Sequence, residues 1–150
     1  MVVGAYDKDA ARFYFNTDAD VGPGKPNRAD DVELVRYGIK ALRNSPKAQT
    51  GGADAAAFMA ASAVVALVGP YDASVGAAVL AFQKLAGFTQ DSIVSKMLGG
   101  ITPRGNSYML QVMQANMRYM HPNLYPRIDT LPEVGPTVST VIRQMFVGAL

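Results

Sequence analysis

The sequence predicts a mainly α-helical protein: a helical bundle with an extended segment near its N-terminus and two additional helices in its C-terminal third. Apolar residues recur at helical spacing in several stretches, and glycine and proline separate these stretches. The chain has 150 residues, of which 49% are hydrophobic and 17% charged. This length and composition are enough for one folded domain with a buried core, expected to span residues 1–150.

The N-terminal part is expected to contain an extended segment, a loop and one helix. Residues 12–15 are Arg-Phe-Tyr-Phe, and aromatic residues favour strands. Residues 21–28 contain two glycines and two prolines, which predicts a loop. A helix should then run to Arg43, with Asp30 and Asp31 capping its first turn. Its apolar face is expected to consist of Val32, Val35, Ile39 and Leu42.

The middle of the chain is expected to form a loop and two helices. Residues 44–53 are mostly polar, which predicts a surface loop. The alanine-rich residues 53–68 predict a buried helix, or a helix followed by a strand. Residues 73–85 predict a further helix, in which burial of Phe82 contributes about 2–3 kcal/mol and anchors the core.

A glycine and a short helix are expected to follow. Gly87 is the expected C-terminal cap of the preceding helix, because glycine adopts a left-handed backbone without steric penalty. Thr89 or Asp91 should then cap a short helix that ends at Met97 or Leu98.

The last third of the chain predicts two more helices. Asn106 or Ser107 should cap a helix through Tyr119, and another helix should run from Pro136 to Gly148. The first of these helices carries a methionine stripe: Met109, Met113, Met117 and Met120. Methionine fills irregular gaps in cores, so we expect the stripe to be buried. The alternative is a methionine and aromatic surface that docks a protein partner.

Residues that usually carry catalysis or bind metals are sparse. The chain has no cysteine and one histidine, His121, so the usual zinc and nucleophile-activating sites are not expected. Asp18 and Asp20 are interpreted as loop residues, and Asp30 and Asp31 as the helix cap described above. We therefore expect a protein that is not an enzyme, with no catalytic residue, metal or cofactor.

Charge and hydropathy exclude further classes. The net charge of +2 is too small to indicate nucleic-acid binding. Arg118, Arg127 and Arg143 are dispersed and expected to be solvated. The first residues include Asp7 and no apolar stretch, so a signal peptide is not expected, and no segment predicts a membrane span. We expect synthesis in the cytoplasm, with the cell envelope or the exterior reached only by a non-classical or apparatus-dependent route.

Three segments resemble the peptidoglycan-binding domain family. Residues 24–42, GKPNRADDVELVRYGIKAL, resemble its opening helix. Gly69-Pro70 followed by residues 77–83, AAVLAFQ, resembles the family pattern of Gly-Pro and a helix ending in Ala-Val-x-x-Phe-Gln. Residues 88–94, FTQDSIV, resemble the turn that comes next. The resemblance covers residues 24–98, about half of the chain.

The resemblance implies a compact three-helix module that holds peptidoglycan in a shallow groove near its Gly-Pro loops. Carried over residue by residue, it makes Gly69, Pro70 and Asp91 candidate ligand-binding residues. Tyr71 and Asp72 are added on chemical grounds, as a stacking surface and a hydrogen-bond acceptor in the same loop.

The chain also departs from the family pattern. Ala66-Leu67-Val68 stands where the family has Asp-Gly, and Ser92 replaces a glycine of the second turn. Residues 44–68 are an insertion, and residues 101–150 are a helical extension expected to pack on the core. The main expectation is a non-catalytic module that recognises bacterial peptidoglycan. The alternative is a protein-interaction or structural adaptor of a phage-like or secretion assembly that keeps the fold without the cell-wall ligand.

Overall fold

The computed structural model of the chain describes residues 2–7, 12–98 and 108–147. This part of the chain is mainly helical, as predicted, with one small antiparallel sheet. No helix in these residues is long and apolar enough to cross a bilayer. The elements in chain order are β1 (Val2–Asp7), β2 (Arg12–Asn16), α1 (Ala29–Leu42), α2 (Pro46–Thr50), α3 (Gly52–Ala63), α4 (Ala73–Ala86), α5 (Met109–Met120), the short 3₁₀ helix η1 (Ile128–Thr130) and α6 (Pro136–Val147).

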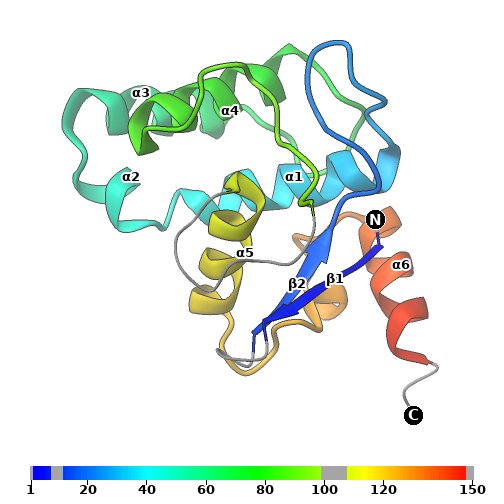
Figure 1. The fold of residues 1–150 in the computed structure, drawn as a ribbon. Helices are drawn as coiled ribbons and strands as arrows, with labels where there is room; N and C mark the ends of the chain where they lie inside the picture. The colour runs from blue at the N-terminus through cyan, green and yellow to red at the C-terminus, as the bar shows by residue number, and fades with distance from the viewer. Residues whose placement is uncertain (1, 8–11, 99–107, 148–150) are drawn as a thin grey trace.

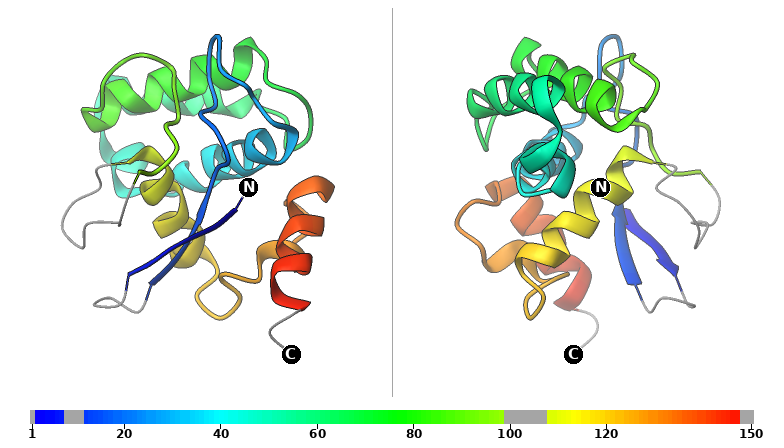
Figure 2. Two further views of the ribbon diagram at one scale, coloured as in Figure 1. Left: turned by 45° about the vertical axis from the view of Figure 1, so that its right-hand side comes forward. Right: turned by 90° about the vertical axis from the view of Figure 1, so that its left-hand side faces the viewer.

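The elements are arranged around helix α1. Helices α3 and α4 pack against each other on one side of α1, and α5, α6 and the β1–β2 hairpin lie on the other side (Figure 1). The two further views in Figure 2 show the same order of layers. Strand β2 confirms the extended segment predicted at residues 12–15, and β1 pairs with it in antiparallel orientation.

Helix α1 is buried on nearly all sides. Every residue from Asp31 to Leu42 except Lys40 is buried, so the predicted apolar face is only part of what the fold covers. Gly38 allows α5 to come close, because a Cβ atom there would lie 2.5 Å from Met113 Sδ. The charged residues Asp31, Glu33 and Arg36 of α1 are therefore buried as well, and their side chains need partners inside the protein.

The core contains most of the methionine stripe and the aromatic anchor. Met109, Met113 and Met117 are buried, which confirms the core interpretation of the stripe. These three methionines are therefore not available to a protein partner. Met120 is partly buried and Tyr119 is 78% exposed, so a methionine and aromatic docking surface at this end of α5 stays a prediction. Phe82 is also buried, as predicted, and its ring packs edge-to-face on Phe58 with 5.2 Å between centroids.

The predicted loop over residues 44–53 is wrong, because it contains helix α2 and the start of α3. Ser45 begins α2: its Oγ accepts a hydrogen bond from the Ala48 N–H at 3.3 Å, and Pro46 occupies the first turn. Serine before proline both ends α1 and starts the next helix. Residues 53–68 are helical only as far as Ala63, and much of α3 is exposed rather than buried.

The short helix predicted after Gly87 is also wrong. Gly87 itself has φ 78° and ends α4 as expected. The residues that follow form turns, with Ser92 at φ 61°, and Val94 then pairs with Val21 in an antiparallel bridge. The Asp91 carboxylate accepts a hydrogen bond from the Ile93 N–H at 2.9 Å, which stabilises a turn in competition with a helix.

Helix ends differ from prediction in further ways. The N-cap of α1 is Arg28, whose side chain forms no capping hydrogen bond, so the helix begins before Asp30. Asp30 and Asp31 lie in the first turn, as predicted, where their charges favour the positive end of the helix dipole. Helices α5 and α6 follow the predicted stretches. The predicted caps of α5 at positions 106 and 107, and the predicted end of α6 at position 148, lie outside the described residues.

Candidate functional site

The loop from Gly69 to Asp72, which carries most of the predicted binding residues, is bonded to a buried arginine. Arg36 is 2% exposed. Its Nε donates to Gly69 O at 3.1 Å, and its Nη1 donates to Ala66 O at 2.8 Å. Its Nη2 donates to Pro70 O and to Asp72 Oδ2, the latter at 3.1 Å. The backbone carbonyls of this loop therefore point towards α1.

Asp72 caps the N-terminus of α4. Its Oδ1 accepts from the backbone N–H groups of Ser74 and Val75 at 2.9 and 3.2 Å, and also from the Ser74 hydroxyl. The Ser74 hydroxyl, together with the Val75 N–H and the Arg36 guanidinium, lowers the pKa of Asp72 to about 2. These contacts give the carboxylate a structural role, and its predicted role as a hydrogen-bond acceptor for a ligand stays a prediction.

Tyr71 packs onto the first turns of α4. Its side chain is partly buried, and a Cβ atom added at Gly76 would lie 2.5 Å from the tyrosine Oη. Burial, followed by the nearby charge of Asp72, raises the pKa of the phenol. Tyr71 is therefore a packing residue of the loop, and this contact requires a glycine at position 76.

Asp91 belongs to a second loop, which is bonded to Gln83. The Gln83 Nε2 donates to Asp91 Oδ1 and to Ile93 O, both at 3.0 Å. Its Oε1 accepts from the N–H groups of Asp91 and Ser92 at 3.1 and 2.9 Å. One buried amide side chain thus satisfies four polar groups of the loop, and it explains why a glutamine follows Phe82 at the end of α4.

The two loops lie at opposite ends of α4. Asp72 precedes a helix of 14 residues, and Asp91 is bonded to Gln83 near the other end. At 1.5 Å per residue the two ends are about 15–20 Å apart. The structure therefore groups Gly69, Pro70 and Asp72 around Arg36 and separates them from Asp91.

A groove of about 730 Å³ lies at the Asp91 end of α4, between α2, the C-terminus of α4 and α5. A smaller hollow of about 200 Å³ next to it shares Phe88 and Thr89, and Asp91 is part of its wall. The larger groove is lined by Ser45, Pro46, Lys47, Phe82, Ala86, Gly87, Phe88, Thr89, Val112, Ala115 and Asn116. Sequence analysis missed it because these residues come from three distant segments and share no local pattern.

The groove combines apolar walls with a few polar side chains. Lys47 is the only titratable side chain among the described residues that line it. The Asn116 Nδ2 already donates to Val112 O at 2.9 Å, which fixes the orientation of that amide. Such a surface suits binding through apolar contact and selected hydrogen bonds, and it offers no acid–base pair for proton transfer.

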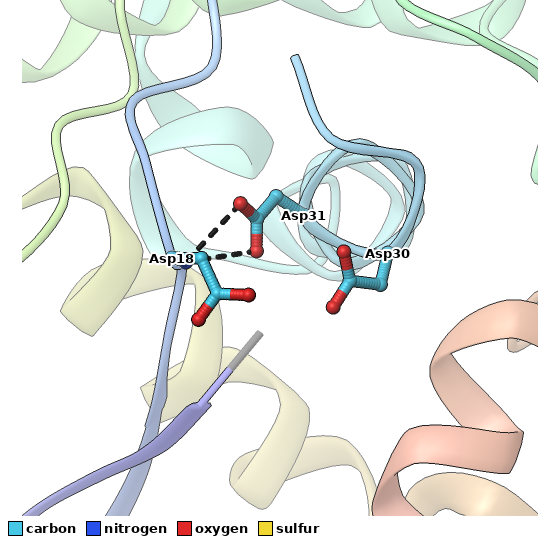
Figure 3. A group of neighbouring side chains, drawn as sticks. All are labelled: Asp18, Asp30 and Asp31. Carbon is cyan, nitrogen blue, oxygen red and sulfur yellow. Dashed lines mark hydrogen bonds between the residues drawn. The ribbon is translucent and has the colours of Figure 1, made fainter. Parts of the chain in front are cut away.

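Three carboxylates meet beside the first turn of α1. The side chains of Asp18, Asp30 and Asp31 place oxygen atoms within 4.8 Å of one another (Figure 3). The Asp31 carboxylate is buried and accepts hydrogen bonds from the N–H groups of Asp18 and Ala19, at 3.0 to 3.2 Å. Carboxylate oxygens are the donors that a hard cation such as Ca²⁺ prefers. In this structure the Asp31 carboxylate instead holds the backbone of residues 18 and 19 against α1 through these hydrogen bonds.

Of the dispersed arginines, Arg143 is exposed, as predicted, whereas Arg118 and Arg127 are partly buried and contact other side chains. Arg127 and Arg143 both approach Asp129, with Nε–Oδ distances of 2.8 and 4.0 Å. The guanidinium carbon of Arg118 lies 5.7 Å from the ring centroids of both Tyr14 and Tyr125. These contacts link β2, α5, η1 and α6, and none of the three arginines lines the groove between α2, α4 and α5.

Comparisons with known proteins give no match: no family model, no curated protein and no solved structure is significantly similar to the chain.

Proposed function

We propose that this protein is a non-catalytic binding module that recognises bacterial cell-wall peptidoglycan in the groove between α2, α4 and α5. The groove is the observation that carries the proposal. Its volume of about 730 Å³ falls within the ~300–1,000 Å³ that is usual for small-molecule sites. A volume of this size suits a disaccharide or a short peptide stem, rather than a whole glycan strand.

The chemistry of the groove agrees with such a ligand. Peptidoglycan offers sugar rings with apolar faces, along with amide and hydroxyl groups. Phe88, Val112 and Ala115 provide apolar surface for the former, while Thr89 and Asn116 provide hydrogen-bonding groups for the latter. The resemblance of residues 77–83 and 88–94 to the peptidoglycan-binding pattern also falls at this end of α4.

Sedimentation with purified sacculi tests the proposal. The wild-type protein should sediment with them at low salt. Ala115→Trp fills the groove from α5 and should weaken binding by at least about tenfold, because the ligand loses its apolar contacts with the groove. Ala77→Trp is the matched control, since Ala77 is exposed on α4 outside the groove, and it should bind like the wild type. Absence of sedimentation, or equal binding by Ala115→Trp, contradicts the proposal.

A second candidate function is the adaptor module, and a different surface favours it. In α3 only Ala55, Phe58 and Ser62 are buried, so the alanines of its other face meet solvent. Val64 and Val68, in the segment between α3 and α4, are 72% and 52% exposed. Exposed apolar surface of this kind is typical of protein interfaces.

Site-specific photo-crosslinking in the cells that express the protein tests the adaptor function. A crosslinker in place of Ala60 should give one defined adduct, and a crosslinker in place of the exposed Arg143 should not. Absence of an adduct at position 60, together with retention by sacculi, leaves peptidoglycan binding as the function.

A further inference from the structure

A second pocket, separate from the groove, lies between the C-terminal half of α1 and the end of α3. Its volume is about 230 Å³. Its charged walls are cationic only: Arg36, Lys40 and Arg43, which follow one another at helical spacing on one side of α1. The other lining residues are Ile39, Ser62, Ala63, Val65 and Leu67.

Two of these three positive charges have no anionic partner in the part of the chain that the structure describes. Arg36 pairs with Asp72 at 3.1 Å. Lys40 is exposed, and its ammonium group forms no hydrogen bond or ion pair with the described residues. Arg43 uses Nη1 for both of its hydrogen bonds, to Met59 O at 2.9 Å and to Ser62 Oγ at 2.7 Å. Both acceptors are neutral, so the charge of Arg43 is not compensated.

The position of Arg43 is fixed before any ligand arrives. The bonds from Nη1 hold its guanidinium against α3, and Nε and Nη2 have no partner among the described residues. A planar guanidinium held in this way is suited to a carboxylate, because it can offer two parallel N–H donors. Lys40, one turn earlier on α1, adds a second charge at the opening of the pocket.

The apolar walls restrict what accompanies the anion. Ile39 is buried, and Val65 and Leu67 are partly buried around the same pocket. We propose that the pocket binds a carboxylate that carries a small apolar group, as at the C-terminus of a peptide that ends in alanine. This site does not depend on what the groove binds.

An NMR titration with N-acetylalanine tests the proposal, and N-acetylalaninamide is the neutral control of the same shape. The acid should shift the backbone amide signals of residues around the pocket, such as Ile39, Ser62 and Leu67. The amide should bind at least about tenfold more weakly, because it loses the charge-assisted hydrogen bonds. Equal shifts by the two compounds, or no shift at millimolar acid, overturn the proposal.

Substitutions test whether the acid binds in this pocket and not in the groove. Lys40→Gln should weaken binding of the acid by about tenfold without changing thermal unfolding, since Lys40 is exposed and its ammonium group makes no bond to the described residues. Lys84→Gln on the exposed side of α4 is the matched control and should bind normally. Ala115→Trp should also bind the acid normally. Wild-type affinity in Lys40→Gln overturns the assignment, whatever the result with sacculi.

Discussion

Arg36 is a charged side chain that lies in the interior, between α1 and the loop before α4. Burying a guanidinium is unfavourable unless its donors are satisfied. Here three carbonyl oxygens and the Asp72 carboxylate accept from it. Arg36 therefore fixes the path of the chain between α3 and α4, including the backbone of Gly69 and Pro70.

Arg36→Leu is expected to destabilise the protein by about 3–5 kcal/mol, because three carbonyl groups of the loop lose hydrogen bonds from a charged donor. Arg36→Lys should recover only part of this loss, since an ammonium group cannot reach the same set of acceptors. Urea unfolding measures both. Arg143→Leu, on an exposed side chain, should change stability by no more than about 0.5 kcal/mol. A loss of less than about 1 kcal/mol in Arg36→Leu would show that water replaces the arginine.

Asp72 is expected to make stability depend on pH in the acid range. Its pKa falls from 3.8 to about 2 in the folded protein, because its ionised form accepts bonds from Ser74, Val75 and Arg36. A carboxyl group that is more acidic when folded favours folding above its unfolded pKa, and that contribution is lost as pH falls through the folded pKa. Asp72 should therefore stabilise the protein fully above about pH 5 and progressively less towards pH 2.

Asp72→Asn isolates this effect, because asparagine can still cap α4 but does not titrate. Urea unfolding at several pH values should give a stability difference between wild type and Asp72→Asn that is constant near neutrality and shrinks below about pH 4. A difference that stays constant down to pH 2 would contradict the assigned pKa.

Helices α1 and α6 are joined by a carboxylate at a helix N-terminus. Glu33 is buried in α1, and its Oε2 accepts from the Val138 N–H in the first turn of α6 at 2.8 Å. A side chain at position 135 would force the Glu33 carboxylate to move. A Cβ atom on Gly135 would lie 2.5 Å from Glu33 Cδ. The glycine before α6 therefore leaves room for the Glu33 carboxylate in the position from which it accepts this bond.

Gly135→Ala is expected to destabilise the protein by about 1–3 kcal/mol, because the methyl group displaces Glu33 from its hydrogen bond. Hydrogen exchange should become faster in the first turn of α6 and stay unchanged in α3. Gly24→Ala is a useful control: no atom lies within 4 Å of its added Cβ, although φ is 69°. It should show only backbone strain, of about 1–2 kcal/mol, and normal exchange in α6. Unchanged exchange in Gly135→Ala would contradict the proposed contact.

The elements differ in how well the sequence predicts them. Helices α1, α4, α5 and α6 have regular apolar spacing, which is a local signal. Helix α2 has five residues, too short for such spacing, and only Ser45-Pro46 marks its start. The short helix expected after Thr89 fails because Gln83 and Val21 supply the partners for that segment, and these contacts are not local.

The candidate site is harder to predict than the helices. The motif residues Gly69, Pro70 and Asp91 do lie in loops, as expected. Their polar groups are bonded to Arg36 and Gln83, and no local pattern reveals the arginine, which lies 33 residues before Gly69. The groove is built from three segments that only the tertiary fold brings together. Local patterns thus identify loops, while long-range contacts decide which surfaces are free.

At the scale of the whole molecule, the N-terminal and C-terminal thirds are bonded to each other. The Gln114 side chain of α5 exchanges hydrogen bonds with the backbone N–H and C=O of Phe15 in β2, the bond to the carbonyl being 2.7 Å long. The Tyr125 hydroxyl donates to Phe13 O at 2.7 Å. The core is a continuous cluster that includes side chains from β2 through α6. The C-terminal helices are therefore part of the core and not an appendage to it.

This continuity predicts that residues 24–98 do not fold alone. The fragment lacks side chains that are completely buried in the full chain: Phe15, Leu110, Met113, Met117, Val138 and Ile142. Burial of each contributes about 1.5–3 kcal/mol, so their combined loss is comparable with the ~5–15 kcal/mol stability of a typical domain. Helix α1, buried on nearly all sides in the full chain, would be exposed along one side.

Circular dichroism and NMR of the fragment and of the full chain measure whether residues 24–98 fold alone. The full chain should unfold cooperatively and give dispersed amide signals. The fragment should give collapsed signals and a broad thermal transition, because α3 and α4 cover only one side of α1. A minimal three-helix peptidoglycan-binding module would behave in the opposite way, with dispersed signals from residues 24–98 alone. The fragment therefore tests directly whether the resemblance in those residues reflects an independent module or helices that need the C-terminal third to fold.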